Sequence, residues 1–223
     1  GAPFATFAGA SVEGFRWISG ADAAQEYPSS EHGKRSFCRT CGTVAPLFMG
    51  GMVVVPVGTL DGDPGMRATA HIFVGSKAPW YEITDTLPQH EEYPPEFAGA
   101  SSVPRPKVEA EAGQTHGSCL CGDVAYEMTG APMFMFQCYC KRCRKGRSAV
   151  HGQNVFYKAD QFRWARGAEL VVDFKVPDAR FFTVSFCKHC GGTVPTVSTA
   201  RNIVIVPAGP LDTDPGMRPM ANI

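Results

Sequence analysis

Apolar residues along this chain fall in short runs, which Gly and Pro interrupt every few positions. Residues 53–58 (VVVPVG), 203–209 (IVIVPAG) and 179–186 (ARFFTVSF) are rich in β-branched or aromatic residues, and residues 123–130 (DVAYEMTG) alternate apolar and polar side chains. These patterns are typical of short strands. No segment keeps a helical period over three turns, although SGADAAQEY (19–27) favours a short helical turn. We therefore predict a mainly β fold of small sheets.

Three segments occur twice, in the same order. FRWISGAD (15–22) returns as FRWARGAE (162–169), FCRTCG (37–42) as FCKHCG (186–191), and VVVPVGTLDGDPGMR (53–67) as VIVPAGPLDTDPGMR (204–218). The copies lie 147, 149 and 151 residues apart, so only small insertions or deletions separate them. We interpret the chain as a tandem duplication of one small domain.

The two repeats lack opposite ends. The first, residues 1–97, has nothing like GSCLCGDVAY or QCYCKRC, which the second, residues 114–223, carries in its first part. The second stops where the first continues through FVGSKAPWYE (73–82). Residues 98–113 between them have the composition of a linker. One hypothesis is that the tail of the first repeat packs against the second and supplies its missing strands; a homodimer is another.

Charge and hydropathy exclude some classes of function. The chain has 21 basic and 21 acidic residues, so no overall positive field favours nucleic acid or an anionic membrane. No apolar run approaches the length of a membrane span, and no secretory signal is apparent. We expect a cytoplasmic protein that binds neither membranes nor nucleic acid.

Nine cysteines are many for such a chain, because clustered cytosolic cysteines more often bind metal or do redox chemistry than form disulfides. Four of them form two closely spaced pairs in the second repeat: Cys119 and Cys121, and Cys187 and Cys190. Gly122 and Gly191 follow these pairs, where a tight turn often needs a positive φ. Two such turns can offer four thiolates to a tetrahedral zinc ion. We predict a structural zinc site, the alternative being two dithiols that never meet.

Three more cysteines crowd into QCYCKRCRK (137–145): Cys138, Cys140 and Cys143. Three protein ligands leave one zinc position open, as in catalytic sites, and an exogenous thiol is a natural fourth ligand. The alternatives are a site closed by His151 or His189, or a trio that is partly linked by a disulfide.

The last two cysteines, Cys38 and Cys41, are the first repeat's counterparts of Cys187 and Cys190. They could be an idle dithiol or disulfide, could compete for Cys119 and Cys121, or could pair across a dimer. We favour the first alternative.

The motifs GSCLCGDVAY, QCYCKRCRK, FCKHCGG and VPAGPLD, in this order, resemble the glutathione-dependent formaldehyde-activating enzyme family, of which centromere protein V is a eukaryotic relative. The resemblance covers nearly all of residues 114–223, and the first repeat matches the later part of the same pattern. It implies a β-tent of small packed antiparallel sheets clamped by zinc and duplicated in tandem. It also implies that the two cysteine pairs are structural ligands and that Cys138, Cys140 and Cys143 are active-site ligands.

By the same resemblance we expect a zinc-dependent carbon–sulfur lyase or synthase, with glutathione or a similar thiol and an aldehyde as partners. Arg144 and Lys145 match the family's CRK and are expected to bind substrate carboxylates. The alternative is a zinc-stabilised, non-catalytic binding or assembly module. A thiol redox protein is disfavoured because no βαβ pattern accompanies the trio.

Other noticeable residues have ordinary structural interpretations. Asp61 and Asp212, in LDGDPG and LDTDPG, are predicted turn formers. Trp80 and Tyr81 are predicted to pack in a core rather than to line a pocket.

Overall fold

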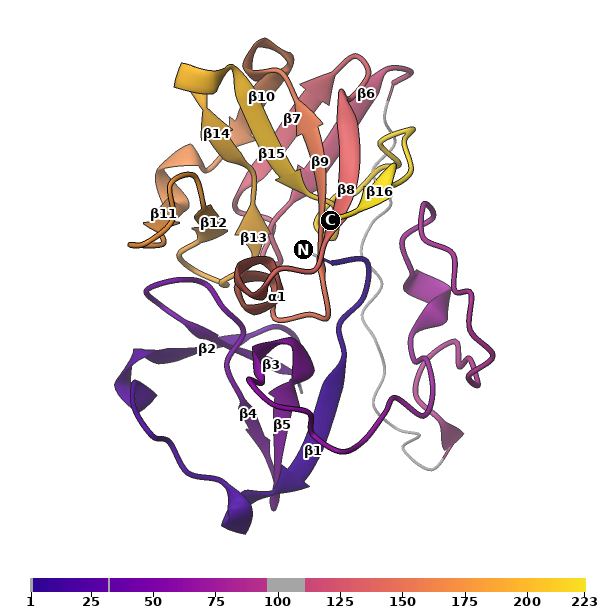
Figure 1. Ribbon diagram of the computed structural model, residues 1–223, viewed down its shortest axis with the longest axis vertical. Helices are drawn as coiled ribbons and strands as arrows, with labels where there is room; N and C mark the ends of the chain where they lie inside the picture. The colour runs from indigo at the N-terminus through magenta and orange to yellow at the C-terminus, as the bar shows by residue number, and fades with distance from the viewer. Residues whose placement is uncertain (1, 32, 96–110) are drawn as a thin grey trace.

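The computed structural model describes residues 2–31, 33–95 and 111–223, and the predicted linker at 98–113 lies largely outside them. The described chain is mainly β, with small sheets and one short α-helix, which confirms the predicted fold class. Figure 1 shows the second repeat above the first, with the helix between them. None of the described helices has the length and apolar composition that crossing a membrane requires.

Three sheets form the second repeat. The first is β10 (Phe162–Arg166), β7 (Ala125–Thr129) and β6 (Gln114–Ser118), and the second is β11 (Val171–Lys175), β12 (Thr183–Cys187) and β13 (Thr193–Val194). The largest runs in the order β14 (Thr196–Ser198), β15 (Ile203–Pro207), β9 (Gly152–Tyr157), β8 (Phe134–Cys138) and β16 (Ala221–Asn222). All neighbours are antiparallel except β16 and β8. Helix α1 (Lys141–Arg147) follows β8, and short 3-10 turns, η6 (Ala159–Gln161), η7 (Ala168–Leu170) and η8 (Thr199–Arg201), connect other strands.

Two further sheets, of three and two strands, form the described part of the first repeat. They are β1 (Phe7–Ser11), β5 (Met52–Pro56) and β4 (Leu47–Met49), and the pair β2 (Ala24–Pro28) and β3 (Lys34–Cys38). Its 3-10 turns are η1 (Val12–Gly14), η2 (Ala21–Ala23), η3 (Val57–Thr59) and η4 (Val74–Ser76). The predicted helical turn at 19–27 is only partly correct, because η2 is short and the ladder with β3 takes Ala24 onward into a strand.

The tail of the first repeat completes the core of the second. Trp80, only 4% exposed, packs in one buried cluster with Tyr126, Met128 and Tyr157 of the second repeat. Ala78 packs against the same cluster. The hypothesis that this tail packs against the second repeat is thus supported, but the described tail adds no strand to its sheets. It contributes the buried indole ring of Trp80 instead.

The two repeats also meet through equivalent turns. A side chain on Gly42 would collide with the ring of Phe186, and one on Gly191 would collide with the ring of Phe37. These two contacts are the same contact seen from each repeat, because the motif copies align Phe37 with Phe186 and Gly42 with Gly191. The turns therefore pack around an approximate two-fold axis, as in an isologous dimer interface.

Helix α1 of the second repeat packs against η3 of the first at the same seam. A Cβ on Gly58 would lie less than 3.0 Å from the backbone of Ala149, so only glycine fits this approach. The Val44 N–H donates to Ser148 Oγ at 2.8 Å. Ser148 caps the helix with a left-handed φ of 54°, a conformation that favours glycine. The seam thus uses the C-cap of the helix, Ser148, and the backbone of the residue that follows it, Ala149.

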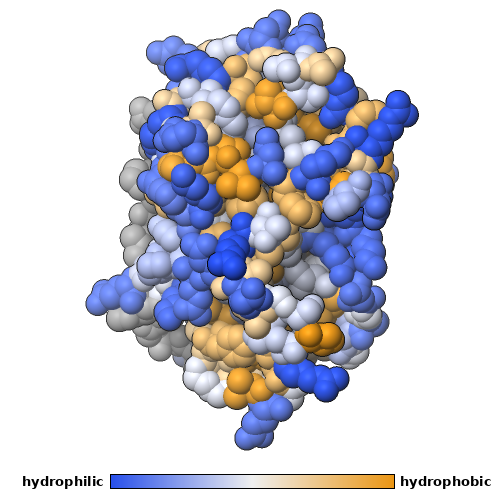
Figure 2. Space-filling view, turned by 90° about the vertical axis from the view of Figure 1, so that its left-hand side faces the viewer, coloured by the Kyte–Doolittle hydropathy of each residue, from blue (hydrophilic) through white to orange (hydrophobic). Residues whose placement is uncertain are grey.

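The first repeat has the thinner core. Phe37 and Val53 are fully buried, whereas Ile18, Met49 and Met52 are 91%, 56% and 53% exposed. Its described residues include no counterparts of β6, β7 and β8, which cover the core of the second repeat. Figure 2 shows apolar side chains at the end of the molecule that the first repeat forms. The second repeat therefore supplies most of the buried apolar interior.

We expect Trp80→Ala to lower the free energy of unfolding by about 3–5 kcal/mol, because the deletion leaves a cavity in the core of the second repeat. Chemical denaturation monitored by circular dichroism measures this loss. Ile18→Ala, at an exposed position, should cost far less. A loss below about 1 kcal/mol for Trp80→Ala would show that the tail does not fill this core in solution.

Gly58→Ala should lower the free energy of unfolding by about 1–3 kcal/mol, because the added methyl group forces η3 away from the backbone of Ala149, just after α1. The matched control is Gly62→Ala, since a Cβ on Gly62 meets nothing within 4 Å. Equal thermal midpoints for the two variants would contradict the close approach at this seam.

Candidate metal centres

The structure brings the four cysteines of the two predicted pairs together. The sulfur atoms of Cys119, Cys121, Cys187 and Cys190 all lie within 4.8 Å of one another. Cys119 Sγ lies 3.4 Å from Cys121 Sγ, which lies 3.8 Å from Cys187 Sγ. Sulfur atoms around a tetrahedral zinc ion lie about 3.8 Å apart, since each Zn–S bond is about 2.3 Å. The donor set and its spacing therefore fit a closed four-thiolate zinc site.

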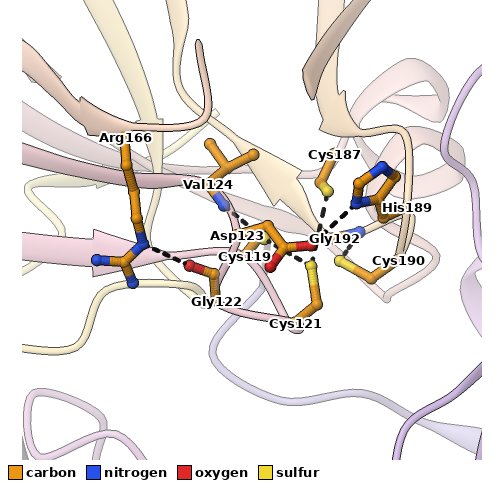
Figure 3. Close-up of polar contacts among 10 residues, drawn as sticks. All are labelled: Cys119, Cys121, Gly122, Asp123, Val124, Arg166, Cys187, His189, Cys190 and Gly192. Atoms are coloured by element: carbon orange, nitrogen blue, oxygen red, sulfur yellow. Dashed lines mark hydrogen bonds and ion pairs between the residues drawn. The ribbon is translucent and has the colours of Figure 1, made fainter. Parts of the chain in front are cut away.

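Two tight turns from different sheets present these sulfurs (Figure 3). Cys119 follows β6, and Cys187 ends β12. Gly122 and Gly191 have φ values of 81° and 65°, so both take the left-handed conformation predicted for them. Backbone amides point at the sulfurs: Val124 N donates to Cys119 Sγ at 3.3 Å and Gly192 N to Cys190 Sγ at 3.4 Å. Such bonds stabilise thiolates and orient them toward a metal.

Neighbouring sulfurs shift the pKa values of three of these thiols. Hydrogen bonding to Cys119 holds the pKa of Cys187 well above the usual thiol value and that of Cys190 well below it. Burial raises the pKa of Cys121 to about 12. Cysteines bind zinc as thiolates, so metal binding at this site would release the protons of the thiols that still carry them.

His189 belongs to the rim of this cluster rather than to its ligand set. Its Nδ1 lies 2.9 Å from Asp123 Oδ2, and the bond from His189 lowers the pKa of Asp123. The pair links the turn after Cys121 to the turn between Cys187 and Cys190 (Figure 3). His189 thus bridges the two ligand-bearing turns and takes no part in the group around Cys138.

The other three predicted cysteines also converge. Cys138 ends β8, Cys140 is the N-cap of α1, and Cys143 lies in the first turn of that helix. Their sulfur atoms lie within 4.8 Å of one another, with Cys140 exposed and Cys143 buried. Cys143 N donates to Cys140 Sγ at 3.4 Å. Because β8 ends at Cys138 and α1 begins just after Cys140, the three sulfurs of residues 138–143 converge on one centre.

No other described His, Cys, Asp or Glu joins this trio within the same distance. His151 is buried and packs with the rings of Tyr139 and Phe4 instead. Burial raises the pKa of Cys143. Burial acts the same way on Cys140, but hydrogen bonds from the Cys143 amide and the Cys138 thiol outweigh it and lower its pKa. On the described residues, the trio offers three ligands and leaves a fourth position to an outside group.

A pocket of about 570 Å³ opens beside Cys140. The residues of the second repeat that line it are Cys140, Lys141, Arg142, Lys145, Gly146, Phe174, Val176, Phe182 and Val184. Cys41 and Thr43 line it from the first repeat. The lining thus combines basic and apolar side chains with the exposed Cys140, whose sulfur belongs to the three-sulfur group. The volume is within the range of small-molecule sites.

The two predicted substrate-binding residues lie in different environments. Arg144 Nη1 donates to the carbonyl of Leu60 at 2.7 Å, across the seam, and Arg144 does not line the pocket beside Cys140. Lys145 lines that pocket, and its Nζ lies 2.8 Å from Asp61 Oδ1. Asp61 also pairs with Lys141 at 3.1 Å. These bonds lower the pKa of Asp61 to about 2.

Contributions of the first repeat to this site were not predicted. Asp61 was interpreted only as a turn former, and nothing in the sequence links it to Lys145, which lies 84 positions away. Cys38 and Cys41 are free thiols, and Cys41 Sγ donates to Thr43 Oγ1 at 3.3 Å. Neither joins the cluster of Cys119 and Cys121, so that alternative is not realised in this structure. The alignment of the two repeats pairs Cys41 with Cys190, and nothing in it indicates that Cys41 lines a pocket.

Comparison with known proteins identifies one family. The family model described as "Glutathione-dependent formaldehyde-activating enzyme" matches residues 1–76 and 114–223, which is most of the chain and covers both repeats. A crystal structure of a Rhodobacter sphaeroides protein from a structural genomics programme is similar at 22% sequence identity, with a TM-score of 0.35. That match covers 47% of this chain and 97% of the other. No curated protein matches the chain.

Elemental analysis should find two metal ions per chain after purification in zinc-containing medium, one for each sulfur cluster. Cys140→Ser should lower this to one, because it removes a ligand from the trio and leaves the four-sulfur cluster intact. Cys38→Ser, outside both clusters, should keep two. A stoichiometry of one that does not change in Cys140→Ser would mean that the trio holds no metal.

Proposed function

This chain belongs to the glutathione-dependent formaldehyde-activating enzyme family, and we propose that its second repeat is a zinc-dependent carbon–sulfur lyase or synthase. Its substrates would be adducts of an aldehyde with glutathione or a similar thiol, such as S-hydroxymethylglutathione. Cys119, Cys121, Cys187 and Cys190 would hold a structural zinc ion. Cys138, Cys140 and Cys143 would hold the zinc ion of the active site.

One observation carries the proposal. Three sulfurs converge with no fourth ligand among the described residues, and the exposed member, Cys140, lies on the wall of the pocket of about 570 Å³. A closed structural site needs no pocket, whereas an enzyme needs a ligand position that a substrate can reach. By contrast, the other cluster of this repeat offers four sulfurs, and none of its cysteines lines this pocket.

A zinc ion held by Cys138, Cys140 and Cys143 would supply Lewis acidity that favours the thiolate form of a substrate thiol. In the synthetic direction the thiol gives up its proton, its sulfur bonds to the aldehyde carbon, and the carbonyl oxygen gains a proton. In the reverse direction the hydroxyl group loses its proton, the carbon–sulfur bond breaks, the aldehyde leaves and the thiol regains a proton.

The chain's own residues prepare this step. The Cys143 amide orients Cys140 Sγ, and burial keeps Cys143 away from solvent. Phe174, Val176 and Phe182 exclude water from one side of the pocket. A drier pocket strengthens the attraction between a thiolate and nearby cations.

Two of the pocket's basic residues give the proposal its substrate preference. Lys145 and Arg142 line the pocket and can bind carboxylates of a thiol such as glutathione. Asp61 holds Lys145 in place and offsets part of its charge. Arg144 is bound to the Leu60 carbonyl, so we assign it to the seam that shapes the pocket.

The test is exchange NMR with ¹³C-formaldehyde and glutathione at equilibrium, which separates the catalysed from the spontaneous rate. The zinc-loaded protein should accelerate exchange between free formaldehyde and S-hydroxymethylglutathione. Cys140→Ser should return exchange to the spontaneous rate, because it removes a ligand at the open site. Cys38→Ser should keep the full acceleration.

Wild-type protein that carries two zinc ions and gives no acceleration with formaldehyde or with larger aldehydes would overturn the enzymatic proposal. That outcome would favour the alternative, a zinc-stabilised binding or assembly module.

A further inference from the structure

A second pocket, of about 310 Å³, lies in the seam between the repeats. The first repeat lines it with Phe4, Val44 and Pro56, and the second with Leu120, Thr193 and Pro210, among others. Of all its described lining residues, only Arg35 and Arg147 carry a charge. Two cations therefore face a common space that contains no described carboxylate.

Both guanidinium groups have unused hydrogen-bond donors. Arg35 Nη2 donates to the carbonyl of Gly191 at 3.3 Å, but its buried Nε has no partner. Arg147 Nη2 donates to Asn154 Oδ1 at 3.2 Å, but its buried Nη1 has no partner. Buried donors without acceptors are rare in proteins, because they lose their bonds to water and gain nothing in return. A guanidinium group cannot escape this cost by losing its proton.

Nearby sulfurs offset part of the positive charge of the two arginines, but they accept no hydrogen bond from the two unpaired donors. Burial lowers the pKa of both arginines, and the sulfurs of Cys190 near Arg35 and Cys143 near Arg147 act in the opposite direction. Neither sulfur accepts a bond from Arg35 Nε or Arg147 Nη1. The two sulfurs thus offset part of the cost of burying these cations, while Arg35 Nε and Arg147 Nη1, buried beside the pocket that their residues line, still lack an acceptor.

We propose that this pocket binds a small oxyanion, a carboxylate or a phosphate, between Arg35 of the first repeat and Arg147 of the second. Guanidinium groups bind the oxygens of such anions with strong, directional hydrogen bonds. One anion would satisfy donors from both repeats and so strengthen the seam that closes the pocket beside Cys140. The oxyanion is either a free ion or the carboxylate of a thiol ligand. As a site for a free anion it goes beyond the proposed function, and as a site for a thiol ligand's carboxylate it rests on that function.

The test uses the full-length, zinc-loaded protein with sodium formate or inorganic phosphate, at an ionic strength held constant with chloride. At least one of the two anions should raise the thermal midpoint to a plateau, because a ligand that binds only the folded state stabilises it. Arg35→Leu and Arg147→Leu should each weaken binding about tenfold or more, since each removes charged hydrogen bonds to the anion. Arg39→Leu, at an exposed position of the first repeat, is the matched control and should bind as the wild type does.

Parallel titrations with glutathione and S-methylglutathione separate the two sources of the oxyanion. If these raise the midpoint in an Arg35-dependent manner and free anions do not, the carboxylate belongs to the thiol ligand. If a leucine variant fails to fold, Arg35→Lys takes its place in the titration. A wild-type crystal soaked in selenate is then the second measurement, and its anomalous density should lie between Arg35 and Arg147. The proposal fails if no anion gives a saturable shift, if Arg35→Leu binds as the wild type does, or if selenate lies elsewhere.

Discussion

Convergence of sulfur atoms from distant parts of the chain is the constraint on which the second repeat depends. Cys119 and Cys121 come from the turn after β6, and Cys187 and Cys190 from the turn after β12, so their cluster joins two separate sheets. Zinc held by four thiolates can contribute about 10–16 kcal/mol of apparent binding free energy, which exceeds the net stability of many small domains. With these sheets fixed, β8 and α1 can present the second group of sulfurs at a defined place beside a pocket.

Residues 1–97, the first repeat, include no three-cysteine motif like that of the second repeat, but they contribute to its site. Trp80 fills the core beneath the large sheet, and Leu60 and Asp61 bind the basic residues of α1. Cys41 and Thr43 complete one wall of the pocket. The seam that makes this possible is built from equivalent turns, with Phe37 against Gly191 and Phe186 against Gly42. The seam therefore places inside one chain the kind of surface that a two-fold dimer would share between two chains.

The local parts of this structure could be predicted from the sequence, because spacing and turn chemistry act over a few residues. Strands β5, β7, β12 and β15, the left-handed glycines after the cysteine pairs and the division of seven cysteines into two groups all follow from such short patterns. The ladder of β2 with β3 was missed, since its partner outweighed a weak helical preference. Packing across the seam could not be predicted. Trp80 was expected in a core, but not in the core of the other repeat. The unpaired donors of Arg35 and Arg147 could not be predicted either, because only folding buries them without an acceptor.

The position of Trp80 in the chain also bears on the order of synthesis. The ribosome makes Trp80 before it makes β7, β8 and β9, so the indole lacks its final neighbours until these strands are synthesised. An apolar side chain exposed in this way favours aggregation. The core of the second repeat is therefore completed last, around a tryptophan that was synthesised before the strands that bury it.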